Sequence, residues 1–125
     1  MTRRPRERGS ASVIVAGVLV AVMVLALGAA DLARVLIAAS RAQTGADAAA
    51  LAAVQGLALA DGADPAEAAS TYANRNGAEL LSCVCEPGTL EARVDVRVPV
   101  GPLLMGPDDL SVGAHARAVV DLPAP

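Results

Sequence analysis

The stretch Gly9–Ala30, GSASVIVAGVLVAVMVLALGAA, decides the fold of this 125-residue chain, because its 22 residues include no charged side chain. As an α-helix it is about 33 Å long, enough to cross a hydrocarbon core of roughly 30 Å. A single segment in lipid satisfies its backbone hydrogen bonds only as a helix. The stretch therefore predicts a membrane-inserted helix. The alternative, a buried helix of a soluble protein, needs a core that the short remainder of the chain does not supply.

The charges around this stretch predict its orientation. Residues 1–9 hold four Arg and one Glu, whereas the rest of the chain holds six Arg and twelve acidic residues. The positive-inside rule therefore places residues 1–8 in the cytoplasm and residues 31–125 outside it. The acidic remainder carries no basic stripe, so the sequence does not support nucleic-acid binding.

Three fates of the apolar segment fit the sequence. It can remain as an anchor. It can be a signal peptide, with small residues before a cut ahead of Asp31. It can also follow a cleavage on the cytoplasmic side, between Gly9 and Ser10, where a Gly and a small residue come after the basic leader.

The helical pattern continues beyond Ala30. Apolar residues spaced for one face of a helix fall within about 120° of its circumference. They are Leu32, Val35, Leu36, Ala39, Ala42, Ala46, Ala50, Ala53, Val54 and Leu57. One helix is therefore expected from about Ser10 to about Leu59, first in lipid and then in water. Its mostly Ala face suits close packing against similar helices, and it equally suits cover by the chain's own sheet.

The remaining chain predicts a small α+β head. Asp64-Pro65 is a strong helix start, so a second short helix is expected from Pro65 to about Asn76, with Tyr72 as the main packing ring. Alternating or short apolar runs then predict three strands. The expected strands are 79–86, 90–100 and 111–122, joined by a turn and by the loop GPLLMGPDD. The fold class is thus α+β, with a long N-terminal helix and a small three-stranded antiparallel sheet.

Few residues offer chemistry. His115 is expected on the polar face of the third strand, and zinc needs three or four ligands. The neighbouring Asp108 and Asp109 are typical of a turn. Cys83 and Cys85 lie two apart on a strand, where their Cα atoms are about 6.6–6.8 Å apart, at the edge of the disulfide range. A local disulfide, free thiols and a bridge to a partner all stay open. No catalytic residue, metal, cofactor or small-molecule substrate is predicted.

Two adjoining parts of the sequence resemble a known family. The basic start with its apolar segment, and the Ala-rich block RAQTGADAAALAAVQGLA that follows, are similar to TadE/TadG-like proteins of Tad (Flp) pilus assembly. The narrower resemblance is to short TadE-like proteins of actinobacteria encoded near secretion ATPases. It covers about residues 6–60, and the remaining α/β part resembles a small pilin head.

This resemblance implies a pseudopilin with a cytoplasmic start and an external head. It implies partnership with other pilins, inner-membrane platform proteins, a secretion ATPase and a prepilin peptidase that cuts between Gly9 and Ser10. Pilin-like members typically carry Glu at the fifth position after the cut, where this chain has Ile14. An accessory role in the membrane does not depend on that Glu.

Together these observations predict a non-enzymatic, single-pass membrane protein, a minor pseudopilin or accessory subunit of a Tad/Flp-type pilus or a type II/IV-like secretion assembly. The alternative is a secreted binding module released before Asp31. An extracytoplasmic thiol protein that uses Cys83 and Cys85 is a third hypothesis. The expected parts are a leader, a transmembrane helix, an amphipathic extension, a head and a tail, at residues 1–9, 10–30, 31–60, 61–122 and 123–125.

Overall fold

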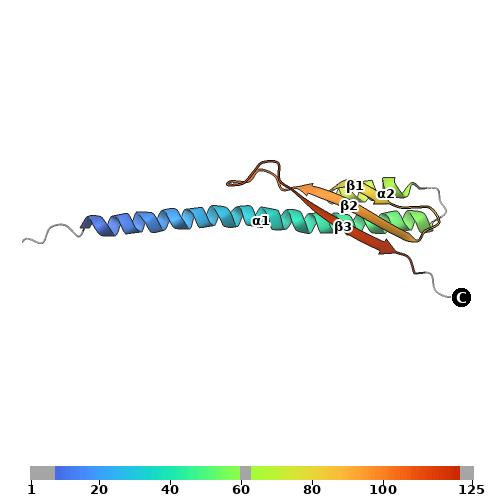
Figure 1. Cartoon of the computed structure of the whole chain (residues 1–125), viewed down its shortest axis with the longest axis horizontal. Coiled ribbons are helices and arrows are strands. Elements are labelled where there is room, and N and C mark those ends of the chain that lie inside the picture. Colours follow the sequence, from blue (N-terminus) through green and yellow to red (C-terminus); the bar gives the residue numbers. More distant parts are fainter. Residues whose placement is uncertain (1–7, 60–62, 122–125) are drawn as a thin grey trace, which may run out of the picture.

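The structure, a computed structural model, describes residues 8–59 and 63–121. One helix dominates it: α1 runs without interruption over Arg8–Ala58, about 77 Å at 1.5 Å per residue. The other elements gather along the C-terminal half of α1, so its N-terminal half projects alone (Figure 1). Residues 1–7 of the leader, residues 60–62 between the two helices, residue 122 of the expected third strand and the tail lie outside the described residues.

The short helix α2 spans Pro65–Arg75 and begins as predicted. The side chain of Asp64 accepts a hydrogen bond from the backbone N–H of Ala66 at 2.9 Å, which satisfies a donor that the helix leaves free. At the other end Gly77 has a φ of +72°, a left-handed conformation that glycine adopts without cost. The chain can therefore turn at once into the first strand.

Three antiparallel strands form one sheet in the order β1-β2-β3. Their bounds are β1 Glu79–Val84, β2 Glu91–Pro99 and β3 Ser111–Val119. The sequence places these three strands correctly, although β1 and β3 end before the expected residues and β2 is one residue shorter at each end. Pro99 is the last residue of β2, so its missing N–H falls at a strand end rather than within the ladder.

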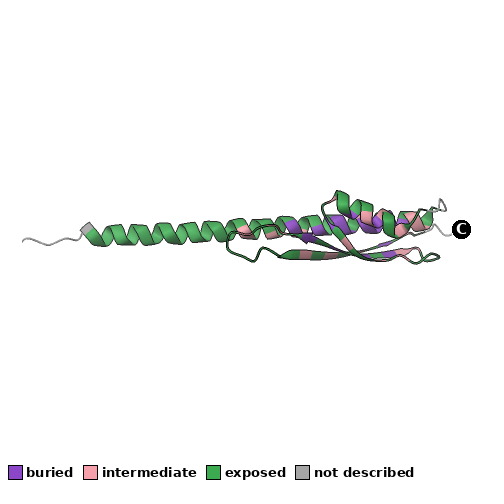
Figure 2. Ribbon diagram, turned by 90° about the horizontal axis from the view of Figure 1, so that it is seen from above, coloured by how far each residue is buried: buried purple, intermediate pink, exposed green. Residues whose placement is uncertain are grey.

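The two helices lie on one face of the sheet: α1 packs against β2 and β3, while α2 packs against α1 and β1. The core between them consists of small side chains, and the largest fully buried ones are Val94 and Val96. Figure 2 shows that burial is confined to this half of the molecule. The α+β fold predicted from the sequence is therefore confirmed, with the Ala face of α1 covered by the chain's own sheet and α2.

Two expectations about packing are wrong. Tyr72 is exposed, with the Arg75 guanidinium 5.0 Å from its ring centroid, because the face of α2 that meets α1 is formed by Ala69 and Ala73. The apolar stripe on α1 also starts to be buried later than expected. Leu32 and Leu36 are exposed, and the first fully covered side chain is Ala38.

Candidate functional site

The uncovered half of α1 is the first candidate site. Every residue from 9 to 30 is exposed, and this part of the helix is long and apolar enough to cross a membrane, with none of it buried by the rest of the chain. Its large exposed apolar side chains are Val13, Ile14, Val15, Val18, Leu19, Val20, Val22, Met23, Val24, Leu25 and Leu27. Soluble monomers rarely expose an apolar surface of this extent.

Gly9 and Ser10, the residues of the expected cleavage site, lie in the first turn of α1 and are exposed. Ile14 follows one turn later with its side chain in the open. No acidic residue occurs in that first turn.

A junction between α1 and the loop joining β2 to β3 lies directly beyond the uncharged stretch. The carboxylate of Asp31 accepts two backbone hydrogen bonds at 2.7 Å, Oδ1 from the N–H of Leu104 and Oδ2 from the N–H of Met105. One turn along the helix, Arg34 donates from Nη1 to the carbonyl oxygen of Pro102. Arg34 Nη1 also lies 3.9 Å from Asp31 Oδ1. The loop is thus fixed to the helix at its tip, next to residue 31.

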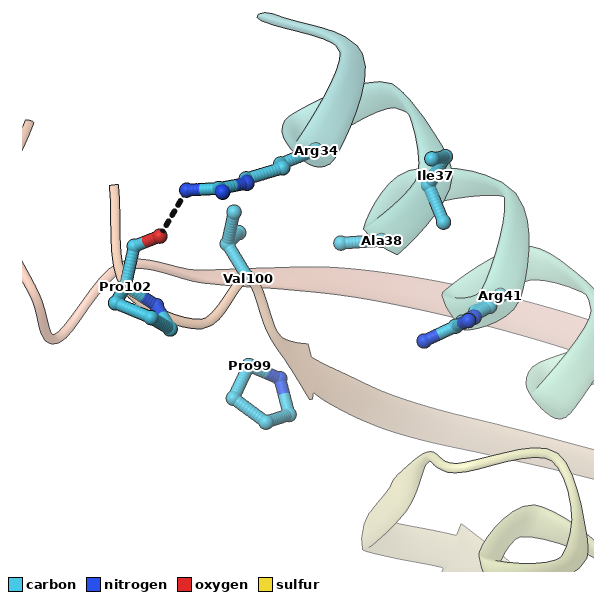
Figure 3. Close-up of a pocket in the computed structure, with 7 residues that line it drawn as sticks. All are labelled: Arg34, Ile37, Ala38, Arg41, Pro99, Val100 and Pro102. Atoms are coloured by element: carbon cyan, nitrogen blue, oxygen red, sulfur yellow. Dashed lines mark hydrogen bonds between the residues drawn. The ribbon is translucent and has the colours of Figure 1, made fainter. Parts of the chain in front are cut away.

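A shallow groove of about 280 Å³ lies beside this junction. Figure 3 shows Arg34 reaching from α1 to Pro102 across the groove, with the side chain of Arg41 further along the same helix. The residues that line the groove are Arg34, Ile37, Ala38, Arg41, Pro99, Val100 and Pro102. The groove therefore combines apolar walls with two cationic side chains.

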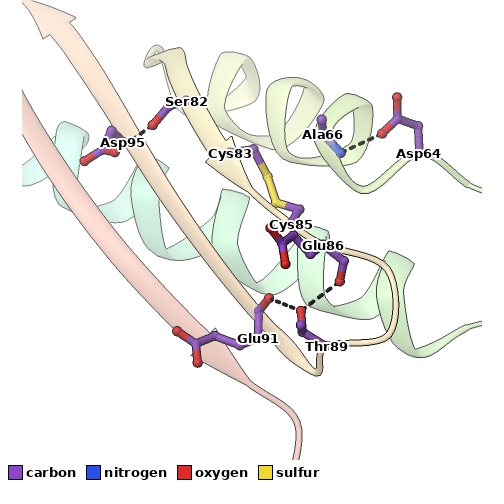
Figure 4. The surroundings of a disulfide bond; sticks show 9 residues. All are labelled: Asp64, Ala66, Ser82, Cys83, Cys85, Glu86, Thr89, Glu91 and Asp95. Carbon is purple, nitrogen blue, oxygen red and sulfur yellow. Dashed lines mark hydrogen bonds between the residues drawn. A yellow bond between two sulfur atoms is a disulfide. The ribbon is translucent and has the colours of Figure 1, made fainter.

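The structure joins Cys83 and Cys85 in a disulfide, with their Cα atoms 5.5 Å apart (Figure 4). The Cα distance is shorter than in an extended strand because β1 ends at Val84 and Cys85 lies past its end. Both cysteines are half-buried against the core. In the adjoining turn the Thr89 hydroxyl donates to the carbonyl oxygen of Glu86 at 2.7 Å.

The outer face of the sheet carries paired charges. Arg93 and Arg117 lie directly opposite each other on β2 and β3, an arrangement of like charges that Glu91 relieves by pairing with both. The hydrogen bond from Arg117, followed by that from Arg93, lowers the pKa of the Glu91 carboxyl below its ordinary value of 4.5, although partial burial acts in the opposite direction.

The remaining expected polar residues are not brought together into a site. His115 is exposed on β3 opposite Asp95, and Asp108 and Asp109 lie exposed in the loop before β3. Within residues 8–59 and 63–121, no three His, Cys, Asp or Glu side chains lie close enough to hold a metal ion.

The junction at Asp31 and Arg34 is the feature that sequence reasoning missed. Its partners are more than 65 residues away and contribute backbone groups, which leave no side-chain signal.

The fold and its exposed helix define a class: an α+β head built on the C-terminal half of one long helix whose other half is suited to a membrane. Comparison with known proteins narrows this class. Residues 9–63 match the Tad family, described as "Putative Flp pilus-assembly TadE/G-like", and this match supports that family for the chain. No curated protein and no solved structure matches it. The family suggests a structural role in pilus assembly rather than catalysis.

Proposed function

We propose that this protein is a non-enzymatic, single-pass membrane subunit of a Tad/Flp-type pilus or a related type II/IV-like secretion assembly, as a minor pseudopilin or an accessory component. One observation carries the proposal. The region that matches the pilus-assembly family, residues 9–63, begins with the exposed apolar half of α1 and continues as the same helix into the core of the head.

The mechanism is physical. The apolar half of α1 lies in the bilayer and packs against helices of other subunits, while its continuation holds the head outside. Because α1 is unbroken, its position in the membrane sets the position of the head. The four Arg that precede the helix favour a cytoplasmic N-terminus. The proposed partners are other pilins or pseudopilins, inner-membrane platform proteins and a secretion ATPase.

We further propose that the N-terminal leader is cleaved and that the two cysteines have a structural role. A prepilin peptidase cuts between Gly9 and Ser10, both exposed at the start of α1. The bond between Cys83 and Cys85 serves to hold the end of β1 and has no redox role in assembly. Its support is that both cysteines are half-buried and pack against the core, whereas reactive cysteines lie in exposed, electropositive surroundings.

A matched pair of substitutions tests the anchor. Leu19 on α1 and Leu81 on β1 are similarly exposed, 58% and 53%, so Leu19→Arg and Leu81→Arg are equivalent surface changes in a soluble protein. In a membrane, an Arg near the centre of the helix costs about 2.5–3.5 kcal/mol on insertion scales. We expect Leu19→Arg to remove the protein from the membrane fraction and Leu81→Arg to leave it there.

The same strains test the assembly role. In the native host, deletion of the protein is expected to reduce the yield of sheared surface fibre or of exported pilin. Wild type, Leu81→Arg and the double variant Cys83→Ser/Cys85→Ser should restore that yield, whereas Leu19→Arg should not. An unchanged yield after deletion, or full restoration by Leu19→Arg, contradicts the proposal. Loss of assembly in the double Cys variant, with the protein still folded in the membrane, contradicts the structural role of the disulfide.

A further inference from the structure

We infer that the loop between β2 and β3 is a second membrane contact, in which the apolar side chains of Leu104 and Met105 enter the interface of the lipid leaflet on the side of the head. This inference rests on the proposed function, because it requires α1 to cross the bilayer. It adds a contact that fixes how the head is oriented on the membrane, which a single helix does not fix alone.

The height of the loop along α1 is the first argument. Asp31 is the first charged residue after the uncharged stretch, and its carboxylate holds the backbone of Leu104 and Met105 at 2.7 Å. When residues 9–30 occupy the hydrocarbon core, residue 31 lies at the membrane surface. The tip of the loop is therefore held at that surface, and Figure 1 shows it extending along α1 away from the head and toward the bare half of the helix.

The side chains at the tip are apolar and uncovered. Leu104 is 54% exposed and Met105 is 59% exposed, so the head leaves both in the open. Two adjacent large apolar side chains, Leu104 and Met105, thus lie at the tip of the loop, where they contribute little to the core. Such side chains gain from transfer to the acyl boundary of a bilayer, as they do on an interfacial helix.

Three backbone groups of the tip already have partners. Backbone groups without partners are costly in the membrane. Here the N–H groups of Leu104 and Met105 donate to Asp31, and the carbonyl oxygen of Pro102 accepts from Arg34. The Asp31 side chain is itself only 13% exposed. These three backbone groups therefore lose no hydrogen bond to water when the loop enters the interface.

The surrounding surface favours lipid over a second copy of the chain. At 100° per residue, exposed Leu32 and Leu36 lie about a third of a turn round α1 from Asp31, so the apolar surface continues around the helix beside the loop. A partner subunit would cover one side only. Arg34 lies at the level of Leu32 and Leu36, and Arg41 lies beyond them along α1. Cations at and beyond the edge of an apolar band match phosphates at the edge of the acyl chains. Asp108 and Asp109, further along the loop, keep the insertion shallow.

Tryptophan fluorescence tests the inference without background, because the chain contains no Trp. The full-length variant Met105→Trp is reconstituted in phosphatidylcholine/phosphatidylglycerol vesicles whose acyl chains are unbrominated, brominated near the headgroup or brominated near the chain end. Val119→Trp, at the far end of β3 and 52% exposed, is the matched control in the head, and Leu19→Trp reports on the anchor. Circular dichroism and urea unfolding verify that each variant folds as wild type does.

We expect brominated lipid to quench at least about half of the Met105→Trp emission, as suits an interfacial depth of 5–10 Å, and to leave Val119→Trp unchanged. Quenching of Leu19→Trp without quenching of Met105→Trp overturns the inference and leaves the proposed anchor standing. Absence of quenching at Leu19→Trp contradicts the proposed function itself. Emission of Met105→Trp that shifts to the blue with protein density, without quenching by bromine, assigns the loop to a second copy and likewise overturns the inference.

Discussion

At the scale of single residues, the head is built by close approach of small side chains. Ala42, Ala46 and Ala53 on α1 are completely buried, and the buried strand residues of the same core are no larger than Val. Small side chains each bury little apolar area, so this core depends on the backbones of α1, α2 and the sheet lying close together. A position at which the approach is closest should tolerate no added atom.

Gly45 is that position. A Cβ atom there would lie 2.7 Å from the Cβ of buried Ala78, which is a short side chain that cannot rotate away. Overpacking lowers the free energy of unfolding by about 1–3 kcal/mol. The higher helix propensity of Ala relative to Gly offsets only about 1 kcal/mol of this loss. We predict that Gly45→Ala lowers the free energy of unfolding by up to about 2 kcal/mol, measured by urea denaturation of the full chain in detergent micelles.

Gly56→Ala is the matched control for this prediction. It is the same change on the same helix, but its nearest neighbour is the Cα of Pro65 at 3.4 Å, an ordinary contact. The helix propensity of Ala should therefore stabilise this variant, by at most about 1 kcal/mol. Equal stabilities of Gly45→Ala and Gly56→Ala would refute the close approach at Gly45.

Glu91 gives a prediction about pH. Its folded-state pKa is lowered, first by the hydrogen bond from Arg117. The stabilisation it provides is therefore present above the unfolded-state pKa, near 4.5, and is lost as the pH falls through the lower folded-state pKa. We predict that Glu91→Gln unfolds at lower urea concentration than wild type at pH 7, and that this difference shrinks steadily below pH 4.5. A difference that is independent of pH would show that the charge of Glu91 does not act in this way.

At the scale of elements, the sequence predicts the helices and strands whose positions follow from hydrophobic periodicity and from turn or capping residues. The start of α2 follows from Asp64-Pro65, and β2 follows from the alternation of Val with charged residues. The single helix α1 follows because neither Pro nor a cluster of polar turn residues interrupts residues 10–59. Burial alternates along β2 and β3, as the alternating apolar residues of the sequence indicate.

Periodicity does not predict tertiary contacts between segments that are distant in the sequence. Tyr72 is the largest apolar ring in the chain, yet its place is decided by which face of α2 lets the helix approach α1, and that face is made of Ala. The docking of the loop on Asp31 depends on backbone N–H groups, which every residue except Pro possesses. No pattern in the sequence marks those particular amides.

The loop's attachment is itself testable. Asp31→Asn preserves the shape of the side chain but replaces one accepting oxygen by an amide that only donates. One of the two bonds to Leu104 and Met105 is then lost, at a cost on the order of 1.5 kcal/mol for a bond to a charged group. We predict that the amide hydrogens of Leu104 and Met105 exchange about tenfold faster in this variant, as measured by NMR in micelles.

Two other backbone amides provide the control in the same spectra. Val100 and Val120 donate to backbone carbonyl oxygens at the ends of the strands, so their exchange should stay as in wild type. Unchanged exchange at Leu104 and Met105 would mean that Asp31 does not hold the loop. Faster exchange at all four amides would indicate a destabilised head rather than a released loop.

At the scale of the whole molecule, the protein is a helix that is covered along one half and bare along the other. The bare half is apolar, whereas the exposed face of the sheet carries ion pairs. This division suits a molecule with one half in lipid and the other in water. Under the proposed function a small core suffices, because the head only has to fold around a helix that the membrane stabilises.

The intact mass and N-terminal sequence of the mature protein, taken from membrane, sheared-fibre and culture-medium fractions, test this account most directly. The account predicts a protein in the membrane or fibre fraction that retains residues 10–30. A start at Ser10 would identify a processed pseudopilin, and a start at Met1 or Thr2 an unprocessed accessory anchor. A protein that starts at Asp31 and is found in the medium would contradict the account, because the bare half of α1 would then be a discarded signal peptide.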